Sequence, residues 1–150
     1  MREEINASLK AAMKAKDTRR TATLRLVNAA IKDRDIEARG EGKENIGDVA
    51  ILALLQKMVK QRDESIAIYD KAGREDLAAQ EREEVAIIKD FLPQPLGDAE
   101  VEEAVVTAIA ESGAQSLRDM GKVVAILKEK FPGRIDFGKA SKIVKGKLAG

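Results

Sequence analysis

Hydrophobic residues recur at helical spacing in two neighbouring runs between Leu54 and Leu92, on either side of Lys71-Ala72-Gly73. Steps of three and four residues place these side chains on one stripe of each run, which is typical of a helix that packs against a partner. The stripe residues are Leu55, Met58 and Tyr69 in the first run, and Leu77, Val85, Ile88 and Leu92 in the second. The pattern predicts a long antiparallel helical hairpin that turns at residues 71–73.

Three charged residues also lie on these stripes: Arg62 on the first, and Glu81 and Glu84 on the second. Arg62 is ten residues before Ala72 and Glu81 is nine residues after it, so an antiparallel hairpin brings the two level. An arginine that faces inward needs a carboxylate partner, because an unpaired buried charge is costly. We interpret the three residues as an ion-pair network that sets the register of the helices. A functional charge cluster is the alternative.

The same periodicity predicts helices before and after this hairpin. Two helices precede it, over residues 3–16 and 18–38, and Pro93-Gln-Pro-Leu-Gly97 ends it because proline disfavours helix at the residue before it. Three shorter helices are expected over residues 98–112, 116–131 and 136–148. We predict an all-α fold with an N-terminal four-helix bundle-like domain at 1–92 that contains the long hairpin. A linker at 93–97 and a small C-terminal three-helix tail domain at 98–150 complete the prediction.

The composition excludes several classes of site. The 150-residue chain has no cysteine and no histidine, which removes disulfides, thiolate nucleophiles, most zinc sites and the usual general base near neutral pH. No apolar run reaches the roughly 18–20 residues that span a membrane. Three of the first five residues, Arg2, Glu3 and Glu4, are charged, and the N-terminus lacks the apolar core of a signal peptide. We expect a soluble cytoplasmic protein with no membrane segment, no metal and no small-molecule cofactor.

Charge is unevenly distributed along the chain, although its total is only +1. Residues 73–112 hold three basic and eleven acidic side chains, whereas residues 113–150 hold nine basic and three acidic ones, a net charge of +6. The candidates for phosphate contacts in this basic tail are Arg118, Lys122, Arg134, Lys139, Lys142 and Lys145. Such a surface can bind RNA, and a merely solvated face is the alternative. Since no aromatic side chain accompanies it, we expect recognition through backbone and shape rather than base stacking.

Several segments resemble the YqeY family, in the family's order and over nearly the whole chain. They are LRLVNAAIKDRDIE at 24–37, LQKMVKQRDESIAIYDKAGREDLAAQEREEVAIIKDFLPQPL at 55–96, DMGKVV at 119–124 and GRID at 133–136. Members of this family are similar to the C-terminal helical and tail regions of the B subunit of glutamyl/aspartyl-tRNA amidotransferase. The resemblance implies a two-domain helical protein whose tail helps to hold tRNA. It also implies the family label of a carbon–nitrogen ligase with glutamine as amide donor.

The resemblance also marks a polar cluster on the family's N-terminal motif: Lys57, Lys60, Gln61, Arg62, Ser65, Arg74, Asp76, Glu81 and Glu84. Ser65 has no evident base near it in the sequence, so we assign no catalytic residue. We expect a tRNA-binding or tRNA-associated accessory protein, with tRNA, a tRNA-handling enzyme or another protein as its partner. One alternative is an enzyme of amidotransferase type, or a component of a tRNA-dependent amidotransferase. The other is a helical adaptor that binds only proteins.

Overall fold

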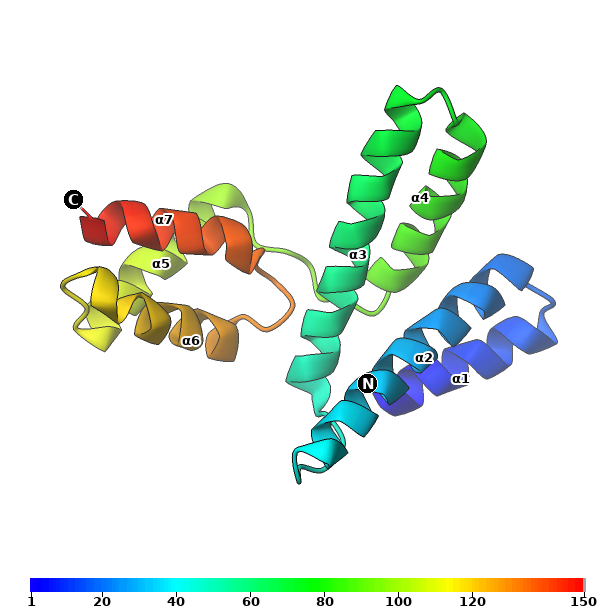
Figure 1. Cartoon of the computed structure of the whole chain (residues 1–150), viewed down its shortest axis with the longest axis horizontal. Coiled ribbons are helices and arrows are strands. Elements are labelled where there is room, and N and C mark those ends of the chain that lie inside the picture. Colours follow the sequence, from blue (N-terminus) through cyan, green and yellow to red (C-terminus); the bar gives the residue numbers. More distant parts are fainter. Residues whose placement is uncertain (150) are drawn as a thin grey trace. The chain divides into compact units, whose positions relative to one another are not determined.

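The computed structural model describes residues 1–149, and every regular element among them is a helix (Figure 1). The elements are α1 (Arg2–Lys14), α2 (Thr18–Gly40), α3 (Asp48–Lys71), α4 (Glu75–Lys89), α5 (Asp98–Ser112), the short 3-10 helix η1 (Leu117–Asp119), α6 (Met120–Lys130) and α7 (Phe137–Ala149). The all-α prediction is confirmed. A composition with 3% aromatic residues and many good helix formers explains it. No helix in this range is long and apolar enough to cross a membrane.

The chain divides into two compact units, unit 1 (Met1–Pro93) and unit 2 (Gln94–Gly150). The division falls inside the segment predicted as a linker, but residues 94–97 contact unit 2. The Leu96 N–H donates to the Arg134 carbonyl over 2.9 Å, and the Arg134 Nε donates to the Gln94 carbonyl, also over 2.9 Å. That the two units are independent domains stays a prediction.

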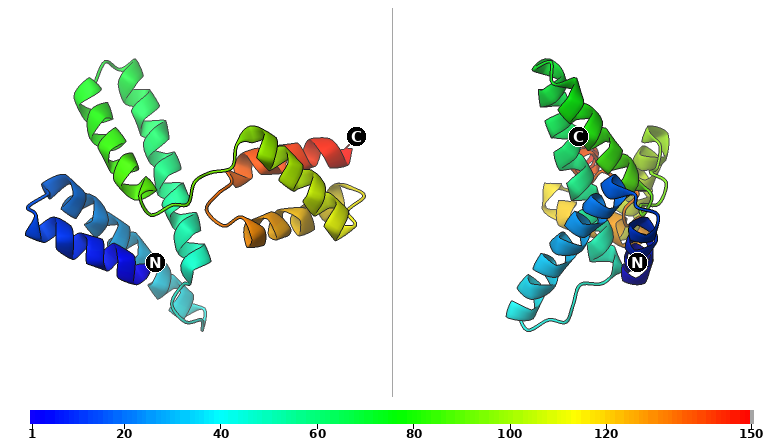
Figure 2. Two further views of the ribbon diagram at one scale, coloured as in Figure 1. Left: turned by 180° about the vertical axis from the view of Figure 1, so that it is seen from behind. Right: turned by 90° about the vertical axis from the view of Figure 1, so that its right-hand side faces the viewer.

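Unit 1 consists of two antiparallel hairpins, α1–α2 and α3–α4 (Figures 1 and 2). They meet mainly where α2 packs against α4, while the main neighbour of α1 is α2. All four helices contribute buried side chains to the core. They include Ile5 of α1, Leu24, Val27 and Ile31 of α2, Ile51, Leu55 and Met58 of α3, and Val85 and Ile88 of α4. The arrangement is more open than a closed four-helix bundle, because α1 packs against α2 rather than along the α3–α4 hairpin.

The turn of the α3–α4 hairpin lies where the sequence predicts it. Gly73 has a φ of +72°, a left-handed conformation that glycine adopts without steric cost. The Arg74 N–H donates to the Tyr69 carbonyl over 2.9 Å, which satisfies one of the free carbonyls at the end of α3. This local geometry lets α4 return along α3 and sets which residues face each other.

Unit 2 is a three-helix unit with an apolar core. α5, α6 and α7 each pack against the other two, around Val105, Val123, Leu127, Ile135 and Val144. Each of these five side chains is essentially inaccessible to solvent. Charged side chains therefore lie on the outside of this unit.

Candidate functional site

The lysine face of α7, defined as Lys139, Lys142 and Lys145, lies on the solvent side of that helix. Ala140 and Val144 are completely buried, and at about 100° per residue the three lysines point away from them. At the start of α7, Asp136 Oδ1 accepts the Gly138 N–H at 2.9 Å. All three lysines are exposed, and none has an ion-pair partner within residues 1–149. They present three free ammonium groups on one surface.

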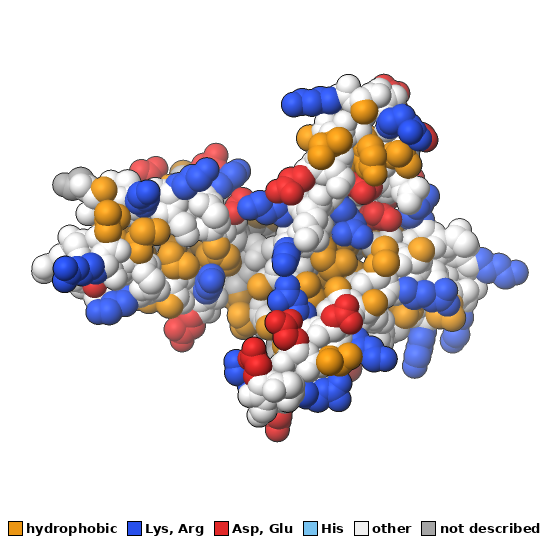
Figure 3. All heavy atoms as spheres, viewed as in Figure 1, with side chains coloured by type: hydrophobic (Ala, Val, Ile, Leu, Met, Phe, Trp, Pro, Cys, Tyr) orange, Lys and Arg blue, Asp and Glu red, His pale blue; other side chains and the backbone are white. Residues whose placement is uncertain are grey.

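The other three tail candidates differ in what they contact. Arg118 is exposed, and Lys122 Nζ lies 3.8 Å from Asp119 Oδ1 with 73% of its side chain accessible. Arg134 is half-buried, and its contact with the Gln94 carbonyl gives it a structural role. Figure 3 shows Lys and Arg side chains spread over the visible face of unit 2, with hydrophobic side chains between them. The structure thus brings three of the six candidates together on α7.

The family's polar cluster lies on the α3–α4 hairpin, and its centre is an ion pair. Arg62 Nε donates to Glu84 Oε2 over 3.1 Å, with the two side chains only 15% and 12% exposed. Arg62 Nη1 donates to the Met58 carbonyl of its own helix over 3.4 Å. Glu81 Oε2 is buried and has no hydrogen-bond partner in the described chain. The predicted clamp therefore forms with Glu84, and the expected Arg62–Glu81 pairing is wrong because the guanidinium turns to Glu84 and Met58.

The remaining residues of this cluster do not converge on one point. The Ser65 hydroxyl donates to the Gln61 carbonyl over 3.2 Å. Lys57, Lys60 and Gln61 are exposed. Arg74 and Asp76 pair with each other at the exposed start of α4, 3.4 Å apart, and the Arg74 guanidinium and then the Leu77 N–H hold the pKa of Asp76 below its usual value. The cluster is a set of separate local contacts along the hairpin.

A partly shielded ion pair between α1 and α2 of unit 1, Arg2–Asp35, was missed by the sequence reasoning; its side chains are 33% and 10% exposed. Arg2 donates to both carboxylate oxygens of Asp35, over 2.8 and 2.6 Å, and also to the Ile46 carbonyl. The Ile46 N–H donates to Asp35 Oδ1 over 3.0 Å. The Arg2 guanidinium lowers the pKa of the buried Asp35, and Asp35 raises the pKa of Arg2. A signal was present, since Asp35 continues the buried stripe of Leu24, Val27 and Ile31 at helical spacing.

A second arginine, Arg20, joins three helices of unit 1 and was also missed. Its guanidinium donates to Ser8 Oγ on α1 over 3.0 Å and to Asp90 Oδ2, just after α4, over 2.9 Å. The same group lies 5.9 Å from the centre of the Phe91 ring, within the range of a cation–π contact. No sequence pattern indicates this contact, because its partners lie 12 and 70 residues away.

The described residues offer little for catalysis or metal binding. No group of three or more acidic side chains within residues 1–149 is placed to hold a metal ion. The Ser65 hydroxyl proton points to a backbone carbonyl rather than to a base. The arrangement supports charge-based binding and structural pairing.

Comparison with models of known protein families identifies the family of this chain. A model of Yqey-like proteins matches residues 2–148. The chain belongs to the YqeY family. Curated relatives of this YqeY-family chain carry the name "Altered inheritance of mitochondria protein 41, mitochondrial".

The relative from Lachancea thermotolerans is 35% identical over 109 residues, covering 71% of this chain and 57% of the relative. The one from Vanderwaltozyma polyspora is 29% identical over 123 residues, covering 77% and 64%. The one from Pyrenophora tritici-repentis is 30% identical over 129 residues, covering 83% and 69%. The YqeY-family chain thus matches less than two thirds of the length of the first two relatives.

The cytoplasmic location predicted from the sequence is contradicted by these relatives, which are mitochondrial by name. That prediction was wrong in its reasoning. It rested on the absence of a signal peptide and of a membrane segment, and neither absence distinguishes one aqueous compartment from another.

Proposed function

We propose that this YqeY-family protein is an accessory RNA-binding protein that contacts the phosphate backbone, with tRNA as the first substrate to test. The observation that carries the proposal is the lysine face of α7. Its three ammonium groups are exposed and have no carboxylate partner in the described chain. They lie in a segment, residues 113–150, with a net charge of +6. Unpaired cations on one helix face can neutralise neighbouring phosphates and release their counterions.

The chemistry of this face favours backbone contacts over base recognition. No aromatic side chain lies on it, because Phe137 is half-buried and packs against the core of unit 2. Stacking of unpaired bases would need such side chains. Lysine ammonium groups act as point charges toward phosphate, so binding should depend on the shape and charge of the RNA more than on its sequence.

The enzyme alternative has no contact in its favour. Ser65 and the Arg62–Glu84 pair are engaged with partners of their own hairpin. The adaptor alternative predicts no RNA affinity at low salt, so a measurement of RNA binding at low salt distinguishes it from the proposal.

The test is filter binding of tRNA at several salt concentrations, with the triple variant Lys139→Glu, Lys142→Glu, Lys145→Glu beside the unchanged protein. We expect the variant to bind more weakly at low salt. We also expect the slope of log affinity against log salt to decrease by about 2 to 3, because each lost phosphate contact removes about 0.7 to 0.9 from it.

A matched control reverses three other exposed lysines, Lys10, Lys14 and Lys32 of unit 1, which also have no ion-pair partner in the described chain. Its change in net charge is the same. Equal losses in both variants would show a general charge effect and contradict a specific surface. Unchanged affinity and slope in the α7 variant would overturn the proposal.

A further inference from the structure

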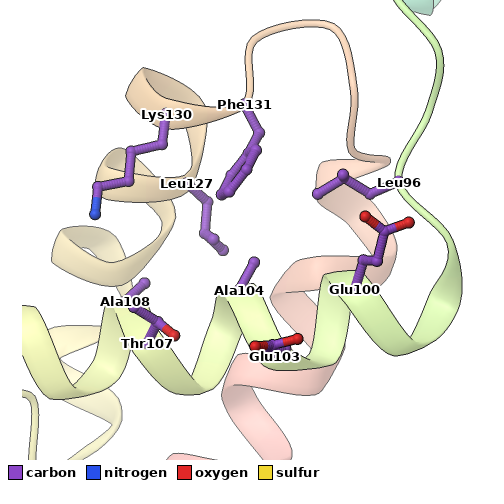
Figure 4. A pocket seen from close by; sticks show the side chains of 9 residues that line it. All are labelled: Leu96, Glu100, Glu103, Ala104, Thr107, Ala108, Leu127, Lys130 and Phe131. Atoms are coloured by element: carbon purple, nitrogen blue, oxygen red, sulfur yellow. The ribbon is translucent and has the colours of Figure 1, made fainter.

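A pocket of about 250 Å³ lies between α5 and α6 within unit 2 (Figure 4). Its lining combines apolar and polar residues. The apolar ones are Leu96, Ala104, Ala108, Leu127 and Phe131, and the polar ones are Glu100, Glu103, Thr107 and Lys130. Figure 4 shows the Phe131 ring and the Leu127 side chain extending from the α6 side toward Ala104 on α5, with Leu96 at one end. Small alanine side chains on the α5 side keep this space open. The pocket can hold an apolar group about as large as one side chain.

The polar groups at its edge carry an excess of negative charge. Lys130 is the cation that lines it, and its Nζ is bound by Glu111 over 2.6 Å. Glu100 accepts the Gly97 N–H over 3.2 Å, a neutral donor that leaves the carboxylate charge in place. Glu103 has no partner in the described chain. Two other acids of α5, Glu111 and Glu102, are paired with Lys130 and Lys147. Glu100 and Glu103 therefore supply the excess negative charge at the edge of the pocket, which favours a cation there.

We propose that this pocket binds an arginine or lysine side chain of a partner protein, with the apolar stem against Leu96 and Phe131 and the cationic group at Glu103. A volume of 250 Å³ is below the roughly 300–1,000 Å³ of most small-molecule sites and suits a single side chain. Arginine fits best, since its planar group can pair with a carboxylate and stack on an aromatic ring. This inference does not depend on RNA binding, which is proposed for the lysine face of α7.

The test uses the full chain labelled with ¹⁵N and a short peptide with one central arginine between glycine and serine residues. We expect amide shifts centred on Ala104, Thr107 and Phe131, with affinity in the millimolar range. The same peptide with citrulline, which keeps the shape and removes the charge, should bind about threefold more weakly. Glu103→Gln should reduce binding of the arginine peptide by a similar factor. Glu129→Gln, at an exposed acid of α6 outside the pocket lining, is the matched control and should leave affinity unchanged.

Three results would overturn the proposal. They are shifts that map away from the pocket, equal binding of the arginine and citrulline peptides, and no saturable shift at millimolar peptide. A separate titration uses agmatine, a small molecule with a guanidinium group on an alkyl stem. Tighter binding of agmatine than of the peptide would assign the pocket to a small-molecule amine and reject a protein partner.

Discussion

Unit 1 and unit 2 use charged residues in different ways. In unit 1, ion pairs with little solvent exposure connect separate helices or segments, as in Arg62–Glu84 between α3 and α4, and Arg2–Asp35 between α1 and α2. In unit 2, the core is apolar, and the pairs Lys130–Glu111 and Lys147–Glu102 lie on the surface. The shielded pairs of unit 1 contribute to how its helices meet, whereas unit 2 contains no comparably shielded pair among its described residues.

This difference decides how substitutions should be interpreted. Exposed pairs contribute little to stability because water and salt screen them. Removing one member of a buried pair leaves an uncompensated charge and is strongly destabilising. A loss of binding after a change in a shielded pair of unit 1 can therefore report unfolding, while a change at an exposed charge of either unit tests binding directly.

The largest effect should come from Arg62→Met. This change leaves the Glu84 carboxylate, only 12% exposed, beside Glu81 without a cation. We expect the free energy of unfolding to fall by about 2 to 4 kcal/mol, somewhat less than for a completely buried pair. Urea unfolding followed by helical circular dichroism measures it.

The matched control for Arg62→Met lies on the same hairpin. Arg82→Met breaks the Arg82–Asp70 pair, whose side chains are 54% and 44% exposed, and should cost less than about 1 kcal/mol. The double variant Arg62→Met, Glu84→Leu should recover most of the lost stability. Equal costs for the Arg62 and Arg82 variants would remove the distinction between buried and exposed pairs.

The next largest effect should come from Asp35→Asn, which changes both the stability and its dependence on acid pH. Because the Arg2 guanidinium lowers the pKa of Asp35 in the folded protein from a reference value of 3.8, the folded state binds fewer protons than the unfolded state near and below that pH. The stability from this pair is complete above the unfolded pKa and is lost as pH falls through the folded one. Asp35→Asn should lower the thermal midpoint by several degrees near neutral pH. When the pH is lowered from about 5 to about 3, the thermal midpoint of the variant should fall by less than that of the unchanged protein.

The control for Asp35→Asn is Asp33→Asn, at an exposed residue of the same helix without a partner in the described chain. The thermal midpoint of this control should depend on pH in the same way as that of the unchanged protein. If the Asp33 and Asp35 profiles coincide, the Arg2–Asp35 pair does not contribute to acid sensitivity.

Local patterns explain what could be predicted from this sequence. The stripe of Leu55, Met58, Val85 and Ile88, with Gly73 at the turn, is encoded within one hairpin and therefore predicted its helices. It also placed Arg62 near Glu81 and Glu84, but it did not decide that Glu84 alone would be the partner. Arg20 and Arg2 contact residues far away in the chain. Helical spacing could have marked Asp35 as buried, but it does not report which long cationic side chain reaches that carboxylate. The pocket of unit 2 was also not predictable, because it depends on how Ala104 and Phe131 face each other across two helices.

A smaller effect, of opposite sign, is expected at Glu81. Its Oε2 is buried without a partner, so the carboxylate has lost hydration and gained no hydrogen bond there. Glu81→Met keeps the length of the side chain and removes this charge next to Glu84. We expect the free energy of unfolding to rise by about 1 kcal/mol, measured by urea unfolding. A clear loss of stability would show that Glu81 shares the cation of Arg62 in solution.

The smallest effect should come from the lysine face of α7. Reversing Lys139, Lys142 and Lys145 breaks no ion pair in the described chain. Glutamate at 139, near the start of α7, is favoured by the helix dipole, whereas glutamate at 145, near its end, is disfavoured, so the two contributions oppose each other. The substitution also removes the excess positive charge of the tail, which reduces self-repulsion. In this variant, for which we propose a loss of tRNA affinity, we expect the free energy of unfolding to change by less than about 0.5 kcal/mol. A loss of stability as large as that of Arg62→Met would make these lysines structural and would end the contrast between the two units.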